Sequence, residues 1–180
     1  MAKIQPNGVH HITLMGADRQ TSMDFWEGVL GFPFVFEQPN LDEPAENHLY
    51  FEPGDGRLIT IFTNEARKPS GNATPTPPGA VHHIAFNMER PAFEAALERL
   101  KEHRIATSGV KDRGFMHSIY FRDPLGLTLE LATYVFEPPK GVLHSEVLRK
   151  SYEIRLAAGD YAIETKHIDQ AITELSRPAT

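Results

Sequence analysis

The sequence predicts an α+β fold made of two copies of one strand, helix, strand, strand, strand unit, followed by a helical extension. The stretch GVHHITL at 8–14 returns as AVHHIAF at 80–86, so a pair of histidines recurs 72 residues later. The stretch YFEPGDGRLITIF at 50–62 aligns without a gap on YFRDPLGLTLELA at 120–132, which lies 70 residues further on. Both ends of the unit recur in the same order, and we therefore infer a duplicated half-domain.

Each copy begins with the strand that carries the histidine pair, and a helix is expected after it. In the first copy, Thr21 or Ser22 can cap a helix that runs through MDFWEGVL and ends at Gly31. In the second copy, Pro91 suits the first turn of a helix in RPAFEAALERLKEHRI. Apolar runs between turn residues predict the remaining strands at 33–38, 47–52, 57–63, 105–110, 115–122 and 127–134.

The segment that joins the copies is rich in Pro, Gly, Ser and Thr, which is typical of a linker. After the second copy, helical patterns near 145–157 and 162–176 indicate an extension outside the repeat. We expect it to pack on the fold or to serve as a dimer arm, and a lid over the site is the alternative. The predicted domains are a first βαβββ module at 1–64, a linker at 65–79, a second βαβββ module at 80–136 and a C-terminal helical extension at 137–180.

Composition limits the classes of partner. The net charge is -6 and there is no run rich in Lys or Arg, which argues against nucleic acid or an anionic membrane and favours a small molecule. The absence of cysteine excludes disulfides, cysteine zinc sites and thiol nucleophiles. The start has no apolar signal segment and no stretch approaches 18 apolar residues, so we expect a cytoplasmic protein.

Strand geometry separates the histidines of each pair. Side chains alternate across a strand, so His11 and Thr13 are expected on one face and His10 on the other. The same alternation separates His83 from His82 in the second copy. The face of His10 and the face of His82 are also the more apolar ones, so His11 and His83 are the histidines expected to line a cavity.

A carboxylate in the last strand of the second copy completes a candidate metal site. Glu130 lies on the strand face opposite a run of leucines, and a buried carboxylate needs a partner. If the two copies close into one cup, Glu130 can converge with His11 and His83. Two imidazoles and one carboxylate with open positions suit non-heme Fe(II), although Zn(II) and Mn(II) can use the same ligands.

The pattern HHITL…FWEGVLGF, then VHHIAF, then YFRDPLGLTLELAT resembles the vicinal oxygen chelate superfamily over about residues 8–134. This superfamily includes glyoxalases, fosfomycin-resistance proteins and extradiol ring-cleaving dioxygenases. The resemblance implies that paired βαβββ modules form an eight-stranded cup around one metal, held by His11, His83 and Glu130. Thr60 stands where glyoxalases carry a second glutamate, which counts against the glyoxalase reaction and leaves room for a substrate on the metal.

Within the superfamily, the chain is most similar to the hydroquinone-cleaving dioxygenases. They carry a second histidine before each ligand histidine, here His10 and His82, and a threonine two residues after the first ligand, here Thr13. They also carry an arginine and a tyrosine upstream of the ligand glutamate, matched here by Arg113 and Tyr120. The resemblance implies an Fe(II)-dependent extradiol-type dioxygenase that acts on a hydroquinone or catechol with O2, with these five residues as the catalytic candidates.

In that interpretation, Tyr120 donates a hydrogen bond to a substrate oxygen, and Arg113 stabilises negative charge. His10 and His82 either orient the metal ligands or are structural. His48, which shares a strand face with Tyr50, is a further candidate for the lining of the cup.

Two other functions stay open on the sequence. One is a redox-neutral isomerase, lyase or thiol transferase that uses Mn, Zn or Ni, and the other is a protein that binds an aromatic compound without turnover. Because two equivalent modules can pair between chains, we also expect a homodimer.

Overall fold

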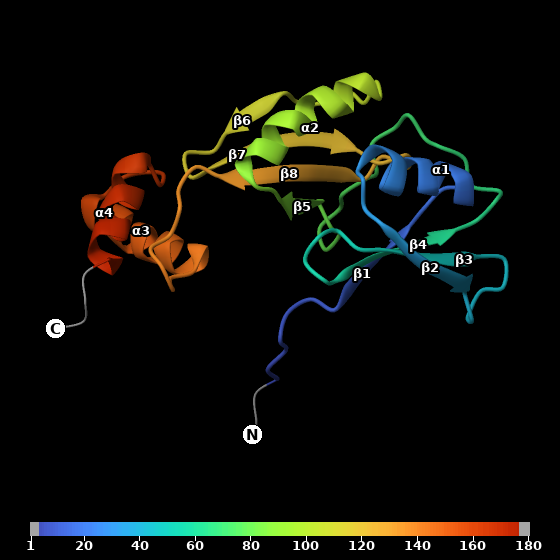
Figure 1. Cartoon of the computed structure of the whole chain (residues 1–180), viewed down its shortest axis with the longest axis horizontal. Helices are drawn as coiled ribbons and strands as arrows, with labels where there is room; N and C mark the ends of the chain where they lie inside the picture. The colour runs from blue at the N-terminus through green and yellow to red at the C-terminus, as the bar shows by residue number, and fades with distance from the viewer. Residues whose placement is uncertain (1–3, 177–180) are drawn as a thin grey trace. The chain divides into compact units, whose positions relative to one another are not determined.

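A computed structural model describes residues 4–176 as two four-stranded mixed sheets with four α-helices (Figure 1). The strands of the first sheet lie in the order β1-β4-β3-β2 and those of the second in the equivalent order β5-β8-β7-β6. Each sheet takes four consecutive strands from one copy of the repeat, which confirms the predicted α+β fold. The strands are β1 (His11–Met15), β2 (Phe34–Pro39), β3 (Asn47–Phe51), β4 (Leu58–Thr63), β5 (His83–Asn87), β6 (Val110–Asp112), β7 (Met116–Arg122) and β8 (Thr128–Tyr134).

The chain divides into two compact units whose limits differ from those of the repeat. The first contains the chain up to Phe86 together with 98–107 and 121–129, and the second contains 87–97, 108–120 and the chain from Glu130 onward. The four domain boundaries expected from the sequence remain a prediction.

In the first sheet, one face is core and the other carries polar and aromatic side chains. β1 runs parallel to β4, while β4, β3 and β2 are antiparallel neighbours. The register places Thr13 opposite Thr60 and Tyr50 opposite the same threonine from the other side. The core face is filled by buried apolar side chains, namely Leu49, Phe51, Ile59 and Ile61, which pack in one unit with Phe25 and Trp26. The strand positions between these core residues are therefore the ones available to line a site.

The first helical segment begins earlier than the sequence predicts. α1 (Arg19–Met23) continues as a π-helical turn, η1 (Asp24–Val29). The cap is Asp18, whose carboxylate accepts hydrogen bonds from the Thr21 backbone N–H at 2.9 Å and the Thr21 hydroxyl at 3.0 Å. Thr21 is therefore a donor to the cap rather than the cap itself, and the prediction of Thr21 or Ser22 was wrong. Gly31, at φ 74°, ends the segment as expected.

In the second sheet, β6 begins later than the strand predicted at 105–110. Ser108 interrupts the ladder, because its Oγ accepts the Tyr120 backbone N–H at 3.0 Å while its own N–H donates to the Tyr120 carbonyl at 2.9 Å. The paired strand then starts at Val110, which lies opposite Ile119. The helix of the second copy, α2 (Arg90–Glu102), lies where the sequence predicts it.

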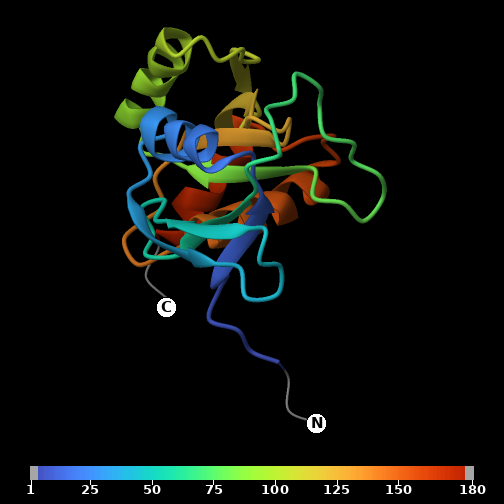
Figure 2. The same cartoon turned by 90° about the vertical axis from the view of Figure 1, so that its right-hand side faces the viewer.

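The segment 64–82, green in Figure 2, holds no helix or strand, yet part of it is held in place. The N–H of Ser70 donates to the Pro124 carbonyl at 2.7 Å, and the N–H of Thr74 donates to the Gly126 carbonyl at 3.0 Å. Gly126 has φ 91°, and a Cβ built on it would lie 1.9 Å from the carbonyl oxygen of Asn72. The predicted linker is therefore a loop that is fixed on the turn before β8.

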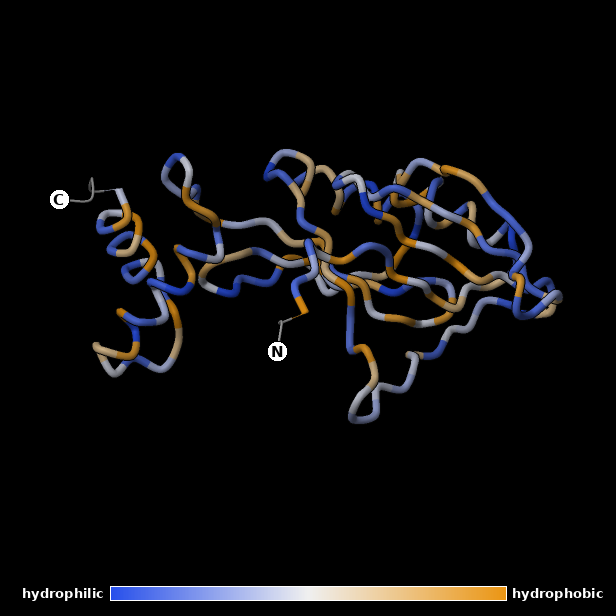
Figure 3. The backbone as a smooth tube through the Cα atoms, turned by 90° about the horizontal axis from the view of Figure 1, so that it is seen from below, coloured by the Kyte–Doolittle hydropathy of each residue, from blue (hydrophilic) through white to orange (hydrophobic). Residues whose placement is uncertain are grey.

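The two C-terminal helices predicted near 145–157 and 162–176 are confirmed as α3 (His144–Ala158) and α4 (Thr165–Leu175). Apolar and polar residues alternate along both helices (Figure 3). Their apolar residues form one buried cluster with Phe136 beyond the end of β8, made of Val147, Ile168 and Ala171. None of the helices within residues 4–176 combines the length and apolar character needed to cross a membrane.

Candidate functional site

Each predicted ligand histidine contacts the histidine that precedes it. The Nδ1 atoms of His10 and His11 lie 2.8 Å apart, and those of His82 and His83 lie 2.7 Å apart. The rings meet edge to face at 81° in the first pair and 83° in the second. The alternation expected within each pair does not hold, because β1 begins at His11 and β5 at His83, so the preceding histidines lie outside the strands.

This contact restricts the protonation of the ligand histidines. Of two imidazole nitrogens that share one hydrogen bond, one carries the proton and the other supplies a lone pair. If His11 and His83 donate from Nδ1, then Nε2 of each carries the lone pair that a metal needs. The same geometry in both copies suggests that the preceding histidines select the metal-binding nitrogen.

Two threonine hydroxyls lie side by side on the same sheet face as His11. The hydroxyl of Thr60, which is fully buried, donates to the Thr13 hydroxyl at 2.9 Å. Because the Thr13 oxygen accepts this bond, its own proton points elsewhere. The first copy therefore holds a hydroxyl donor at the position where the second copy carries Glu130.

An aromatic cluster continues this face onto β3 and β2. The Tyr50 hydroxyl lies 2.8 Å from His48 Nδ1, and Phe36 stacks on Tyr50 with ring centroids 4.0 Å apart. His48 Nε2 is buried and has no hydrogen-bond partner among residues 4–176. Burial of the ring, followed by the charge of His11, lowers the pKa of His48 below 6.5. The neutral ring of His48 therefore belongs to the same face as the predicted ligand.

Arg113 and Tyr120 lie together in the second unit. Arg113 follows β6, and its guanidinium carbon lies 5.6 Å from the centroid of the Tyr120 ring in β7. Two residues before Tyr120, the fully buried Ser118 Oγ has no hydrogen-bond partner within the described chain. Glu130 belongs to the same unit and is 1% exposed. The spacing in the sequence thus identified two residues that the structure brings into contact.

The three predicted metal ligands are divided between the two units of the chain. Among residues 4–176, no three His, Cys, Asp or Glu side chains form a group that could hold a metal ion. His11 and His83 belong to the first unit and Glu130 to the second. The three-ligand set therefore stays a prediction.

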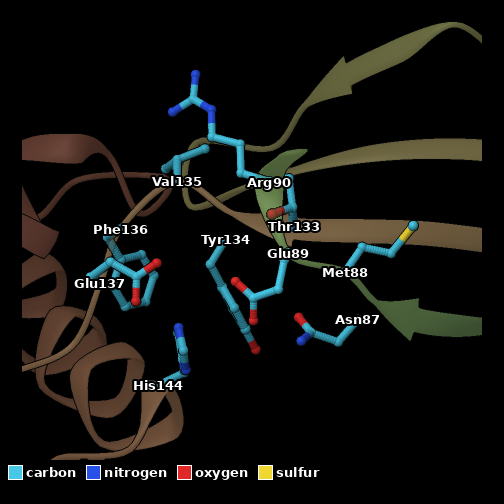
Figure 4. Close-up of a pocket in the computed structure, with 10 residues that line it drawn as sticks. All are labelled: Asn87, Met88, Glu89, Arg90, Thr133, Tyr134, Val135, Phe136, Glu137 and His144. Carbon is cyan, nitrogen blue, oxygen red and sulfur yellow. The ribbon is translucent and has the colours of Figure 1, made fainter. Parts of the chain in front are cut away.

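One cavity, of about 310 Å³, lies entirely within the second unit (Figure 4). It is found where β5 and β8 end and α3 begins, and none of the predicted site residues lines it. Tyr134 stacks on His144 at one wall, with ring centroids 4.1 Å apart and planes 19° from parallel. No sequence pattern pointed to this cavity, because its walls come from the ends of three separate elements.

Known proteins share both sequence and fold with the chain. "Putative ring-cleaving dioxygenase MhqA" of Bacillus subtilis (strain 168) is 31% identical over 133 residues, covering 69% of this chain and 40% of that protein. The crystal structure of a putative dioxygenase from Bacillus subtilis subsp. subtilis str. 168 is 29% identical, with a TM-score of 0.59 over 70% of this chain and 40% of that one. The structure of SMU.1112c is 27% identical, with a TM-score of 0.60 over 71% of this chain and 99% of that one.

The chain spans about 40% of the length of the first of these relatives. The family model for the "Glyoxalase/Bleomycin resistance protein/Dioxygenase superfamily" matches residues 8–131, a range that contains both sheets up to the middle of β8. With its two equivalent four-stranded sheets and this match, the chain belongs to the glyoxalase/bleomycin resistance protein/dioxygenase superfamily.

Proposed function

We propose that the chain forms a metal-dependent ring-cleaving dioxygenase that acts on a hydroquinone or catechol with O2. The observation that carries this proposal is the Nδ1 to Nδ1 contact that recurs in both copies of the repeat, at 2.8 and 2.7 Å. The name of the relative MhqA supports the class of reaction. We further propose Fe(II) as the metal, with Mn, Zn and Ni as alternatives, and a homodimer as the assembled form.

His11, His83 and Glu130 would hold the metal. Their donor chemistry fits, because two imidazoles and one carboxylate are a common ligand set for divalent iron. The local geometry is compatible with this, since a proton donated from Nδ1 of His11 and of His83 would leave Nε2 of each as the coordinating nitrogen. A bound metal supplies positive charge that favours deprotonation of a substrate hydroxyl and a place where the ring and O2 meet.

His10 and His82 then act as positioning residues. Each accepts the Nδ1 proton of the next histidine, which fixes that ring and its tautomer. Phenylalanine in place of either would keep an aromatic ring of similar size while removing the acceptor. We therefore expect such variants to lose metal affinity by about 10-fold to 100-fold, the range typical of outer-shell partners.

The hydroxyl of Thr13, whose oxygen already accepts from Thr60, donates its proton toward a substrate oxygen. Tyr120 donates from the second unit, and the adjacent guanidinium of Arg113 stabilises negative charge on the ring oxygens. These residues bind and orient the substrate and hold protons at named oxygens.

Anaerobic loading with Fe(II), followed by a panel of dihydroxybenzenes and 18O2, tests the proposal. We expect O2 uptake and a yellow ring-opened product that contains one substrate plus both labelled oxygen atoms. No uptake with any member of the panel would overturn the assignment.

Metal analysis separates the two competing functions. Zn, Ni or Mn in protein purified without added metal, with an activity that does not respond to O2, would indicate a redox-neutral enzyme. Unchanged binding of an aromatic compound by His83→Ala, together with no bound metal, would indicate a binding protein instead. Gel filtration with light scattering tests the homodimer.

A further inference from the structure

Side chains with oxygen acceptors gather around the cavity in the second unit. Glu89 and Asn87, which are exposed, and Thr133, which is buried, all line it. Thr133 is 5% exposed, so its hydroxyl is a nearly buried polar group that faces the cavity.

Figure 4 shows how these groups are arranged around Tyr134. The carboxylate of Glu89, the amide of Asn87 and the hydroxyl of Tyr134 point toward one another, and His144 lies on the other side of the Tyr134 ring. The stack on His144 fixes the ring of Tyr134. One polar end of the cavity therefore presents three oxygens beside an aromatic face.

The charge around the cavity is negative. Glu89 and Glu137 line it, whereas the guanidinium of Arg90 turns away and pairs with Glu94 at 3.2 Å (Figure 4). An anion would meet the carboxylate of Glu89 at the polar end, which disfavours binding. A cation would be stabilised both by the carboxylate and by the face of the tyrosine ring.

We propose that this cavity binds a primary ammonium ion on a short organic chain. An ammonium group has three N–H donors, which matches the three oxygens of Glu89, Asn87 and Tyr134. Its carbon chain would lie against the ring of Phe136, which is 9% exposed and lines the same cavity. A cavity of about 310 Å³ is large enough for a small amine. This site is separate from the proposed ring-cleaving chemistry and does not depend on it.

Isothermal titration calorimetry of the full chain with n-butylammonium tests the site. We expect saturable binding, and at least tenfold weaker binding of n-butanol, which has the same carbon chain but no charge. Tetramethylammonium, which is charged but has no N–H donor, should also bind at least tenfold more weakly. Equal binding of all three would overturn the proposal, and so would no binding of n-butylammonium at any concentration that the titration reaches.

Variants place the binding in this cavity. Glu89→Gln keeps the size and removes the charge, so we expect at least a tenfold loss of affinity for n-butylammonium. Glu98→Gln is the matched control, because Glu98 is an exposed glutamate on the same helix region that pairs with Lys101 and lies outside the cavity, and it should bind as the wild type does. Asn87→Asp adds a second carboxylate and should strengthen binding. An unchanged affinity in Glu89→Gln would show that the ammonium ion binds elsewhere.

Discussion

The hydroxyl of Thr60 donates a hydrogen bond to the hydroxyl of Thr13 across the parallel pair of β1 and β4, at 2.9 Å. In the repeat, Thr60 occupies the position of Glu130, so the two copies present different chemistry at one equivalent place. One copy offers a carboxylate, and the other offers a hydroxyl that orients its neighbour.

Thr60→Val should lower catalytic activity clearly while changing the free energy of unfolding only slightly. Valine keeps the shape of threonine but removes the donor, and a lost neutral hydrogen bond costs about 1 kcal/mol. Because Thr13 no longer has a fixed proton direction, we expect a several-fold fall in kcat/KM for the ring substrate. Thr63→Val, a buried threonine of the same strand on the opposite face, is the control for stability. Equal kinetic effects of the two variants would contradict the role assigned to Thr60.

Tyr120→Phe should lower kcat while leaving the fold intact. The ring and its contact with the guanidinium of Arg113 remain, and only the hydroxyl that we assign as the proton donor is lost. Steady-state kinetics with the best dihydroxybenzene should show a fall of about 100-fold, the lower end for a lost general acid. Tyr152→Phe is the matched control, because the guanidinium carbon of Arg155 likewise lies 5.3 Å from the centroid of the Tyr152 ring, on α3. That control should behave as the wild type does.

His48→Phe should change stability little at neutral pH, because the loss of the hydrogen bond between the Tyr50 hydroxyl and Nδ1 offsets the removal of the unpaired Nε2, and it should lower activity. The substitution removes Nε2, which is buried without a hydrogen-bond partner, and keeps an aromatic ring next to Phe62. Burial holds the folded-state pKa of His48 below 6.5, so protonation favours the unfolded chain. The stability advantage of His48→Phe should therefore grow as the pH falls below about 6.5. Urea unfolding at several pH values measures it, and an advantage that shrinks toward acid would contradict this account.

Gly126→Ala should destabilise the fold by more than about 1 kcal/mol. The residue has φ 91°, and the added Cβ would lie 1.9 Å from the Asn72 carbonyl oxygen. Thermal unfolding measures the loss. Gly71→Ala, in a loop position where a Cβ meets no atom within 4 Å, is the matched control. A similar melting temperature for both variants would show that the loop is not packed on this turn.

His167→Ala should destabilise the C-terminal helices by about 2 kcal/mol. His167 is 2% exposed, accepts the Glu164 N–H through Nδ1 at 2.9 Å, and places Nε2 2.8 Å from Asp160. Hydrogen bonds from Lys166 and then His167 hold the pKa of Asp160 below 3.8. The stability that these bonds give the folded state is therefore present above pH 3.8 and is lost as the pH falls through the folded-state pKa of Asp160. Hydrogen exchange of α4 amides should report faster opening in His167→Ala, and unchanged protection would contradict it.

The strands could be predicted because each depends on a local alternation of apolar and polar residues. The two stretches at 50–62 and 120–132 align without a gap, so the pattern in one copy supports the pattern in the other. The start of α1 was missed because Asp18 was three residues away from the pattern that marks the helix. The start of β6 was predicted too early because the Ser108 hydroxyl, and not a backbone carbonyl, accepts the hydrogen bond from the Tyr120 N–H. The alternation of apolar and polar residues gives no sign of such a bond.

Parts of the site were accessible from the sequence and parts were not. The spacing of Arg113 and Tyr120 led to a real contact. The sequence left open that His10 orients His11, but it did not predict the contact between the two rings, because alternation applies only within the strand and His10 lies before it. The cavity beside Tyr134 could not be foreseen, because stacking on His144 depends on where α3 begins in space.

The loop fixed on the turn before β8 has a consequence for dividing the protein into separate chains. A gene cut after residue 76 would yield two fragments, each holding one copy of the repeat. The carbonyls of Pro124 and Gly126 would then lose the covalently supplied donors of Ser70 and Thr74. In the second fragment alone, the turn at Gly126 would be exposed to solvent until the C-terminal end of the first fragment bound to it. The loop that joins the two copies thus completes a turn of the second copy by hydrogen bonds. Each copy therefore depends on the other for its folded structure, although both arise from the same repeated unit.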